Sequence, residues 1–270
     1  MPQRPQRLVM PINEIDFKTI IVEHKNNVLY IKLNRPEKKH AINPAMTNEL
    51  LYVLDFAANE ESVRVLELSS QGNIFCAGGD LRTMAGEEND DIPNMDGNLA
   101  DVIKKLRGLF KPTVCRIEGD VYAGALLLVC NSTHVYAREN VTFTAPEIKR
   151  GIWPFMVMAG LFRVMPKRQG LDFIMRGNSI NALQAKETGL VTEVLNEKDF
   201  NSQVNSIVAE LAGLPPKAMQ RGLKAHAQQE FNDFEASMEF LENEINESLQ
   251  TDEAIEGITA FLEKREPNWK

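Results

Sequence analysis

The sequence predicts an α/β protein whose C-terminal part is entirely helical. Up to about residue 198, apolar segments of strand-like composition alternate with amphipathic helical segments, which is typical of a largely parallel sheet. Beyond residue 198 the strand signals vanish and only helical periodicity continues. The chain has 270 residues, 43% of them hydrophobic, so it can bury a sizeable core.

The N-terminal part follows an order of strand, helix and strand. Residues 28–33 (VLYIKL) predict a strand, and residues 44–59 predict an amphipathic helix with proline in its first turn. Residues 63–68 (VRVLEL) predict the next strand. A second helix over 99–110 leads through a Lys-Pro breaker into a strand over 113–117.

The C-terminal part consists of predicted helices joined by short links. The helices cover residues 200–211, 216–228, 234–249 and 252–264. A Gly-Leu-Pro-Pro link at 213–216 separates the first two. We therefore divide the chain into an α/β core at 1–198 and a helical region at 199–270.

Charge and cysteine content exclude several classes of protein. The 30 Lys and Arg against 38 Asp and Glu give a net charge of −8, which offers a nucleic acid no long-range attraction. Cys76, Cys115 and Cys130 form no CxxC spacing, so we expect neither a disulfide framework nor a metal site, and a cytoplasmic location. No apolar run is long enough for a signal peptide or a membrane span, so no membrane partner is expected.

Residues 84–98 (MAGEENDDIPNMDGN) predict a surface loop, because they are acidic, rich in breakers and without periodicity. Two interpretations stay open for it, a solvated loop and a lid over a substrate. The dense charge run at 87–91 is most simply a solvated turn.

Two glycine-containing segments are candidates for binding a negatively charged oxygen. The first, FCAGGDL at 75–81, has two glycines after an apolar strand end, where the backbone can approach a ligand and leave an amide free. A tight turn is the alternative. In the second, Gly124 lies where a loop becomes a helix predicted at 125–131, and a helix N-terminus presents unpaired N–H groups. An oxyanion could bind at such amides.

Glu147 is the candidate base. The Pro-Glu pair that contains it precedes a mainly apolar stretch at 153–158. The carboxylate is therefore expected beside poorly solvated surface, which raises its pKa and makes it a better base than an exposed carboxylate.

Five segments together resemble a known family. LNRPEKKHAIN at 33–43, FCAGGDL, GDVYAG, PEIKRG and the terminal FLEKREPNW are similar, in order and spacing, to the signatures of the crotonase (enoyl-CoA hydratase/isomerase) family. The resemblance covers about residues 18–268. It implies an α/β fold, a crotonase-like spiral of ββα turns with a C-terminal helical oligomerisation region, usually a homotrimer or homohexamer. It implies an acyl-CoA substrate, with coenzyme A as part of that substrate and no tightly bound cofactor.

The resemblance also implies roles for individual residues. Matched position by position, the two oxyanion-hole amides fall on Gly79 and Gly124, and the catalytic glutamate falls on Glu147. The coenzyme A positions fall on Lys38, Ala41, Ile42, Ala77, Phe261 and Lys264. Phe261 and Lys264 are similar to residues that reach the nucleotide of a neighbouring subunit, although helix core is an equally good interpretation of Phe261.

Leu127 departs from the pattern of the family's hydratases, which place two glutamates about one water. The upstream glutamate matches Leu127, which on a helix should face the same cleft as the Gly124 amide. The lone Glu147 resembles instead the Δ3,Δ2-enoyl-CoA isomerases, whose chemistry needs one base. We therefore expect double-bond isomerisation.

The residues after Glu147 narrow the reaction further. Phe155 stands where dienoyl-CoA isomerases and aryl-CoA dehalogenases carry an aspartate, so those two reactions are disfavoured. Trp153, Met156 and Met158, together with Phe155, predict an apolar acyl pocket.

Two alternatives to an isomerase stay open. One is a hydratase or hydrolase that recruits a second carboxylate from Asp120, Glu87 or Asp91. The other is a catalytically weak acyl-CoA binder, for which Leu127 and the unusual AGALLL segment argue. His40, in the proposed coenzyme A loop, is interpreted as a solvated side chain.

Overall fold

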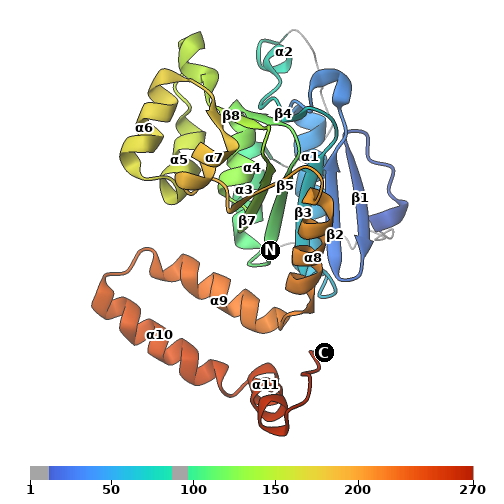
Figure 1. The fold of residues 1–270 in the computed structure, drawn as a ribbon, viewed down its shortest axis with the longest axis vertical. Coiled ribbons are helices and arrows are strands. Elements are labelled where there is room, and N and C mark those ends of the chain that lie inside the picture. The colour runs from blue at the N-terminus through green and yellow to red at the C-terminus, as the bar shows by residue number, and fades with distance from the viewer. Residues whose placement is uncertain (1–11, 87–96, 270) are drawn as a thin grey trace, which may run out of the picture.

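Two sheets form the centre of the molecule in the computed structural model, which describes residues 12–86 and 97–269 (Figure 1). The larger sheet has six strands in the order β1-β2-β3-β5-β7-β10, and the smaller has four in the order β4-β6-β8-β9. The larger sheet contains β1 (Ile20–Lys25), β2 (Val28–Leu33), β3 (Val65–Ser70), β5 (Thr113–Ile117), β7 (His134–Arg138) and β10 (Glu193–Leu195). The smaller contains β4 (Ile74–Cys76), β6 (Asp120–Tyr122), β8 (Thr142–Thr144) and β9 (Ile180–Asn181).

The chain winds between the two sheets in repeated turns. Strands β3, β5 and β7 enter the larger sheet, and each is followed at once by β4, β6 or β8 in the smaller sheet. Helical segments then lead to the next turn. Neighbouring strands are parallel except in the pairs β1–β2 and β8–β9. The predicted α/β spiral of ββα turns is therefore confirmed.

Helices of the body fill the connections between strands. They are α1 (Pro44–Asn59), α2 (Leu81–Met84), α3 (Leu99–Gly108), α4 (Leu126–Cys130), α5 (Phe155–Val164), α6 (Lys167–Arg176) and α7 (Ala182–Glu187). Short 3₁₀ turns are η1 (Ile12–Glu14), η2 (Pro36–Lys38), η3 (Ala123–Ala125) and η4 (Pro146–Arg150). Every residue of β5 and α4 is buried, so the sheets and α4 form the main core.

Helix α8 (Phe200–Gly213) packs on the outer face of the larger sheet. Phe200, Val204 and Val208, spaced one helical turn apart, are buried in a second apolar cluster with strand residues. Arg116 on β5 pairs with Glu67 on β3 and also donates to the side chains of two asparagines on α8. These contacts attach α8 to the body.

The remaining helices extend beyond the body (Figure 1). They are α9 (Pro216–Gln229), α10 (Phe234–Ser248) and α11 (Asp252–Glu263). The helices predicted beyond residue 198 are thus present, with ends that differ by at most a few residues. The division into 1–198 and 199–270 stays a prediction. No helix within the described ranges is long and apolar enough to cross a membrane.

Several elements differ from their predicted bounds for local reasons. The strand predicted at 63–68 begins at Val65, because the Val63 amide closes a turn onto Glu60. The helix predicted at 99–110 ends at Gly108, since Phe110 has a left-handed φ of 51°. The helix predicted at 125–131 is preceded by the 3₁₀ turn η3.

Candidate functional site

Three adjacent parallel strands end side by side and bring the candidate residues to one edge of the smaller sheet. β4 pairs with β6, and β6 pairs with β8. Gly79 follows β4, Gly124 follows β6, and Glu147 follows β8. Because the carboxyl ends of parallel strands meet at the same edge, the loops that carry these three residues are neighbours.

The orientation of the Gly79 amide follows from its pairing with Ile42. The Ile42 N–H donates to the carbonyl of Gly78 at 2.7 Å, and the Asp80 N–H donates to the carbonyl of Ile42 at 2.9 Å. In a parallel pairing, two such bonds flank the middle residue, whose own N–H and C=O point to the opposite side. The Gly79 amide is therefore directed away from Ile42.

Gly124 lies against the same turn. A Cβ atom built on Gly124 would be 3.5 Å from the amide nitrogen of Gly79, and one built on Gly78 would be 2.9 Å from the amide nitrogen of Gly124. Gly124 is also the second residue of η3, and the first N–H groups of a helix have no partner within the helix. The preceding Ala123 has a φ of 53°, a strained conformation for a residue with a side chain.

Apolar side chains flank the two glycines. The sulfur of Met84 lies 3.2 Å from the Cβ position of Gly79, and a methyl carbon of Leu99 lies 3.6 Å from that of Gly124. Hydrogen bonds to an oxygen that binds here would be strengthened by the low polarity of these neighbours.

Glu147 is half-buried in η4, and its Oε2 atom is buried without a hydrogen-bond partner among the described residues. Burial raises the pKa of Glu147, against weaker lowering effects from its own backbone amide and the charge of Arg150. A buried carboxylate oxygen without a partner is costly, so such a group is a candidate for proton transfer.

Leu127 is a core side chain, 3% exposed, in the helix that follows Gly124. It brings no ionisable group to this side of the site. The loop carboxylates Glu87 and Asp91 lie outside the described residues.

Asp120 lies at the opposite end of β6 from Gly124. One of its carboxylate oxygens accepts from the backbone and hydroxyl of Thr142, at 2.7 and 2.9 Å, and the other accepts from the hydroxyl of Tyr122. Thr142 is the first residue of β8, so Asp120 joins the amino ends of two strands. At roughly 3.3 Å per residue, Asp120 is on the order of 10 Å upstream of Gly124.

The structure brings the predicted coenzyme A positions Lys38, Ala41, Ile42 and Ala77 together. The Ala77 N–H donates to the carbonyl of Lys39 at 3.0 Å, just before the Ile42 pairing described above. Ala41 and Ile42 are buried, whereas Lys38 and Ala77 are half-buried. The 38–42 loop, expected to bind coenzyme A, therefore lies directly beside the turn that contains Gly79.

Phe261 and Lys264 are not brought to this site within one chain. Phe261 is 82% exposed on α11, and Lys264 caps the C-terminus of that helix with a left-handed φ. Figure 1 shows α11 at the opposite end of the molecule from α2 and β4.

The interpretation of His40 as a solvated side chain is wrong. His40 is 2% exposed, and its Nδ1 accepts from the Arg35 N–H at 3.1 Å. Its Nε2 must therefore carry the proton, which it donates to the carbonyl of Gln71 at 2.9 Å. His40 thus fixes the conformation of the loop from inside.

A buried ion pair between Arg35 and Asp80 also escaped the sequence analysis. Arg35 Nη1 lies 3.2 Å from a carboxylate oxygen of Asp80, with only 10% and 7% of the two side chains exposed. Both charged residues lie within segments that the sequence analysis singled out, Arg35 in LNRPEKKHAIN and Asp80 in FCAGGDL. Neither segment alone predicts that Arg35 pairs with Asp80, because the two residues are far apart in the sequence.

The predicted apolar acyl pocket is only partly present. Trp153 and Met158 are half-buried, and Trp153 packs against the core. Phe155 and Met156, at the start of α5, are exposed, so they do not close a pocket within one chain.

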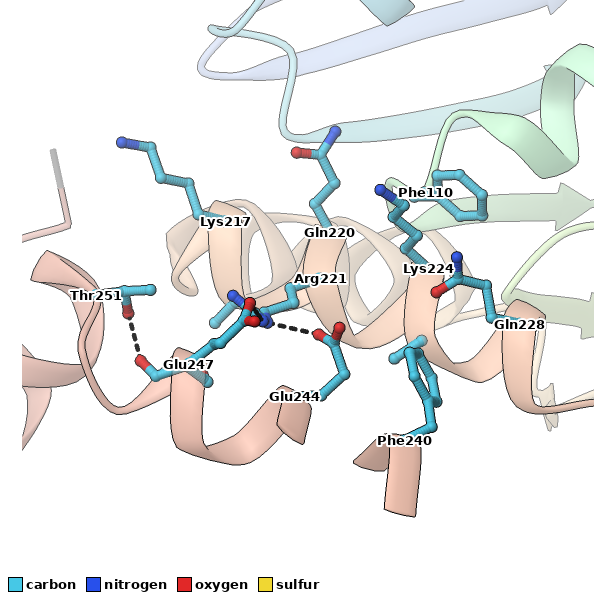
Figure 2. A pocket seen from close by; sticks show the side chains of 13 residues that line it. Phe110, Lys217, Gln220, Arg221, Lys224, Gln228, Phe240, Glu244, Glu247 and Thr251 are labelled. Atoms are coloured by element: carbon cyan, nitrogen blue, oxygen red, sulfur yellow. Dashed lines mark hydrogen bonds and ion pairs between the residues drawn. The ribbon is translucent and has the colours of Figure 1, made fainter. Parts of the chain in front are cut away.

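A hollow of about 660 Å³ lies between α9, α10 and the body (Figure 2). Arg221 of α9 crosses it to pair with Glu244 and Glu247 of α10, each at 2.6 Å, while Lys217 and Lys224 point toward the body. None of the predicted site residues lines this hollow, so we do not assign the chemistry to it.

The fold and the edge that carries two glycine turns and a glutamate define a protein of the crotonase class. A model described as enoyl-CoA hydratase/isomerase matches residues 23–270, and the chain belongs to that family. It is therefore an enzyme of the hydratase/isomerase type acting on acyl-CoA, as the sequence motifs predict.

Known relatives extend over nearly the whole chain. The 2,3-dehydroadipyl-CoA hydratase of Escherichia coli is 29% identical over 93% of this chain and 98% of its own length. The mevalonyl-coenzyme A hydratase of Aspergillus fumigatus is 28% identical over 90% of this chain and 92% of its own. The crystal structure of an enoyl-CoA hydratase from Mycobacterium smegmatis is 25% identical and superimposes with a TM-score of 0.85, covering 93% of this chain and 99% of that one.

Proposed function

We propose that this protein is an enoyl-CoA isomerase that moves a double bond from C3 to C2 of an acyl thioester. The observation that carries the proposal is Glu147, whose buried Oε2 has no partner among the described residues. Buried Leu127 stands where the resemblance to the family's hydratases would place a second carboxylate. One base that is poorly solvated suits a reaction in which the same proton leaves and returns.

Each step follows from the chemistry of the three site residues. Glu147 takes a proton from C2 of the 3-enoyl thioester, and the electron pair of the broken C–H bond delocalises onto the thioester oxygen. The Gly79 and Gly124 amides donate hydrogen bonds to that oxygen and stabilise the dienolate. Protonated Glu147 then returns the proton at C4, which leaves the double bond between C2 and C3 and restores the carboxylate.

Hydration of a 2-enoyl thioester is the second candidate, because the Escherichia coli and Aspergillus relatives carry hydratase names. Water must be oriented and deprotonated while another proton reaches C2, and a second carboxylate normally shares these tasks. Leu127 cannot take part, and Asp120 is engaged with Thr142 and Tyr122 at the far end of β6. Isomerisation is therefore favoured.

We propose further that coenzyme A binds along the Lys38, Ala41, Ile42 and Ala77 loops and that a neighbouring subunit supplies Phe261 and Lys264. The chain would act as a homotrimer or homohexamer. Large apolar side chains exposed on α10, at its C-cap and on α11 support this assembly, among them Phe234, Met238, Ile245, Leu249, Ile255, Ile258 and Phe261. A cytoplasmic location stays a prediction.

A direct comparison of substrates tests the reaction. Purified protein is given a 3-enoyl-CoA and a 2-enoyl-CoA of equal chain length, and the products are separated by chromatography. We expect isomerisation of the former to outrun hydration of the latter. Equal rates, or hydration alone, would make the isomerase assignment wrong.

A further inference from the structure

The turn that contains Gly78 and Gly79 has no side-chain contacts from these two residues to fix its conformation. Gly78 and Gly79 have no side chains, and Gly78 has a φ of 87°. Among the described residues, the strand pairing of this turn is a single parallel bridge to Ile42, and the helix that follows, α2, is a single short turn (Leu81–Met84). An anchor outside the glycines is therefore needed to keep the Gly79 amide in one orientation.

Asp80 supplies one half of that anchor. Its backbone N–H donates to the carbonyl of Ile42 at 2.9 Å. One carboxylate oxygen accepts from the Arg82 N–H at 3.2 Å and caps α2, and the other faces Arg35. The residue next to Gly79 thus has three separate attachments.

Arg35 supplies the other half. Its Nη1 donates both to the carbonyl of Ala41 at 2.5 Å and to the carboxylate of Asp80 at 3.2 Å. Its backbone is held in turn, because its N–H donates to buried His40 and its carbonyl accepts from the His40 N–H at 2.8 Å. One guanidinium therefore joins the 35–42 loop to the residue after Gly79.

We propose that Arg35 and Asp80 are positioning residues that keep the Gly79 amide directed at the thioester oxygen. The inference rests on the proposed function, in which that amide binds the oxygen. It goes beyond that function because it assigns a role in the reaction rate to two charged residues that do not touch the substrate. Because both side chains are about nine-tenths buried, the ion pair is not screened as an exposed pair would be.

A second buried pair offers a matched control. Arg116 and Glu67 lie in the larger sheet with 9% and 6% of their side chains exposed, and their nitrogens and oxygens are 2.9 Å apart. This pair links β3, β5 and α8 and does not border either glycine turn. Arg116→Lys should therefore reproduce the structural effect of Arg35→Lys without its effect on the site.

The test uses cinnamoyl-CoA, a conjugated thioester whose absorption shifts to the red when its carbonyl oxygen accepts hydrogen bonds. Binding and spectrum are measured for wild type, Arg35→Lys, Asp80→Asn and Arg116→Lys, beside kcat, KM and thermal unfolding. We expect Arg35→Lys and Asp80→Asn to lose most of the red shift. Their kcat should fall about 10- to 100-fold with KM changed less than about threefold, because an oxyanion contact acts mainly in the transition state. Arg116→Lys should keep both the shift and kcat.

A double variant shows whether Arg35 and Asp80 act together on the Gly79 amide or affect the rate independently. If the two residues act as one unit, Arg35→Lys with Asp80→Asn should lose no more kcat than the worse single variant. Should Arg35→Lys fail to fold, Asp80→Asn alone still decides the matter, since it keeps the shape of the side chain.

The outcomes distinguish this inference from the function on which it rests. Wild type that binds cinnamoyl-CoA without a red shift would contradict the two-amide site itself. Wild type with the shift, and variants that keep both shift and kcat while unfolding at a lower temperature, as Arg116→Lys would, would overturn only the positioning role.

Discussion

A Cβ atom placed on Gly124 would lie 3.5 Å from the amide nitrogen of Gly79, so the turns after β4 and β6 are separated by little more than the width of a methyl group. Their proximity depends on Gly78, where a Cβ atom would lie 2.7 Å from Cβ of Ala123 and 2.9 Å from the Gly124 nitrogen. Two glycine turns can meet at one point only because no side chain separates them.

We expect Gly78→Ala to be both unstable and inactive. The added methyl group collides with backbone, and φ is 87°, so overpacking adds to conformational strain. The loss should be about 2–4 kcal/mol in the free energy of unfolding, with kcat at least about 10-fold lower. Urea unfolding and the isomerase assay measure the two effects.

Gly72→Ala is the matched control for this substitution. Gly72 has nearly the same φ, 86°, but nothing lies within 4 Å of its Cβ position. It should therefore lose only the strain, about 1–2 kcal/mol, and keep its activity. If Gly78→Ala behaved like Gly72→Ala, the close contact of the two turns would be refuted.

Glu147→Gln should remove the base while keeping its shape. We expect kcat to fall about 10²-fold or more, with binding of coenzyme A nearly unchanged, because the substitution lies away from the proposed coenzyme A loop. Glu187→Gln, at the exposed end of α7, serves as the control and should be fully active. A normally active Glu147→Gln enzyme would make Glu147 structural and favour an acyl-CoA binder.

The pH dependence of activity follows from the burial of Glu147. Burial raises the pKa of this carboxyl from its ordinary value of 4.5, and the base must be ionised to accept a proton. The acid limb of the kcat profile should therefore have its midpoint above pH 4.5. A rate profile flat down to pH 4.5 would rule out a buried base.

Stability should show the same raised pKa with a definite sign. Below pH 4.5 Glu147 is protonated in both the folded and the unfolded protein, so wild type and Glu147→Gln differ little. As pH rises, the unfolded state ionises first and the folded state later, so wild type loses free energy of unfolding relative to Glu147→Gln. Urea titrations of both proteins between pH 4 and 7 measure the difference, which would not change with pH if the pKa were normal.

The elements predicted from sequence were those with strong local signals. The strand at 28–33, the helix at 44–59 and the strand at 113–117 have the predicted bounds. Each has an apolar pattern with a breaker at one of its ends, and the helix has Asn43 as an N-cap that accepts from the Met46 N–H. Local chemistry is sufficient for such segments.

The site was predictable only in part, because its geometry depends on distant pairings. The motifs singled out Gly79, Gly124 and Glu147, and the structure places these residues after the neighbouring strands β4, β6 and β8. The orientation of the Gly79 amide depends on Ile42, far away in sequence, and the burial of His40 depends on Gln71. The hydrophobic pattern within one segment cannot predict contacts with residues that are distant in the sequence.

Assembly should depend on the exposed apolar face of α10. Met238→Glu places a charge in that face and should shift the mass measured by light scattering toward the monomer, because burying an unpaired charge is costly. Leu183→Glu on α7 is the control, since Leu183 is similarly exposed, 60% against 53% for Met238. Monomeric wild type at micromolar concentration would contradict the proposed trimer.

Leu127→Glu tests which reaction the site permits. The new carboxylate would restore a second acid and base, so the ratio of hydration to isomerisation should rise about 10-fold or more. Leu127 is only 3% exposed, so the variant should also lose roughly 2–4 kcal/mol in free energy of unfolding at neutral pH. Leu127→Gln controls for the shape and polarity of the new side chain and should leave the ratio unchanged. Rates are compared per folded molecule, with circular dichroism as the measure of folding. If wild type already hydrates as fast as it isomerises, Leu127 does not decide the reaction. The second carboxylate would then have to come from a residue other than Asp120, because Asp120 is held at the far end of β6 by Thr142.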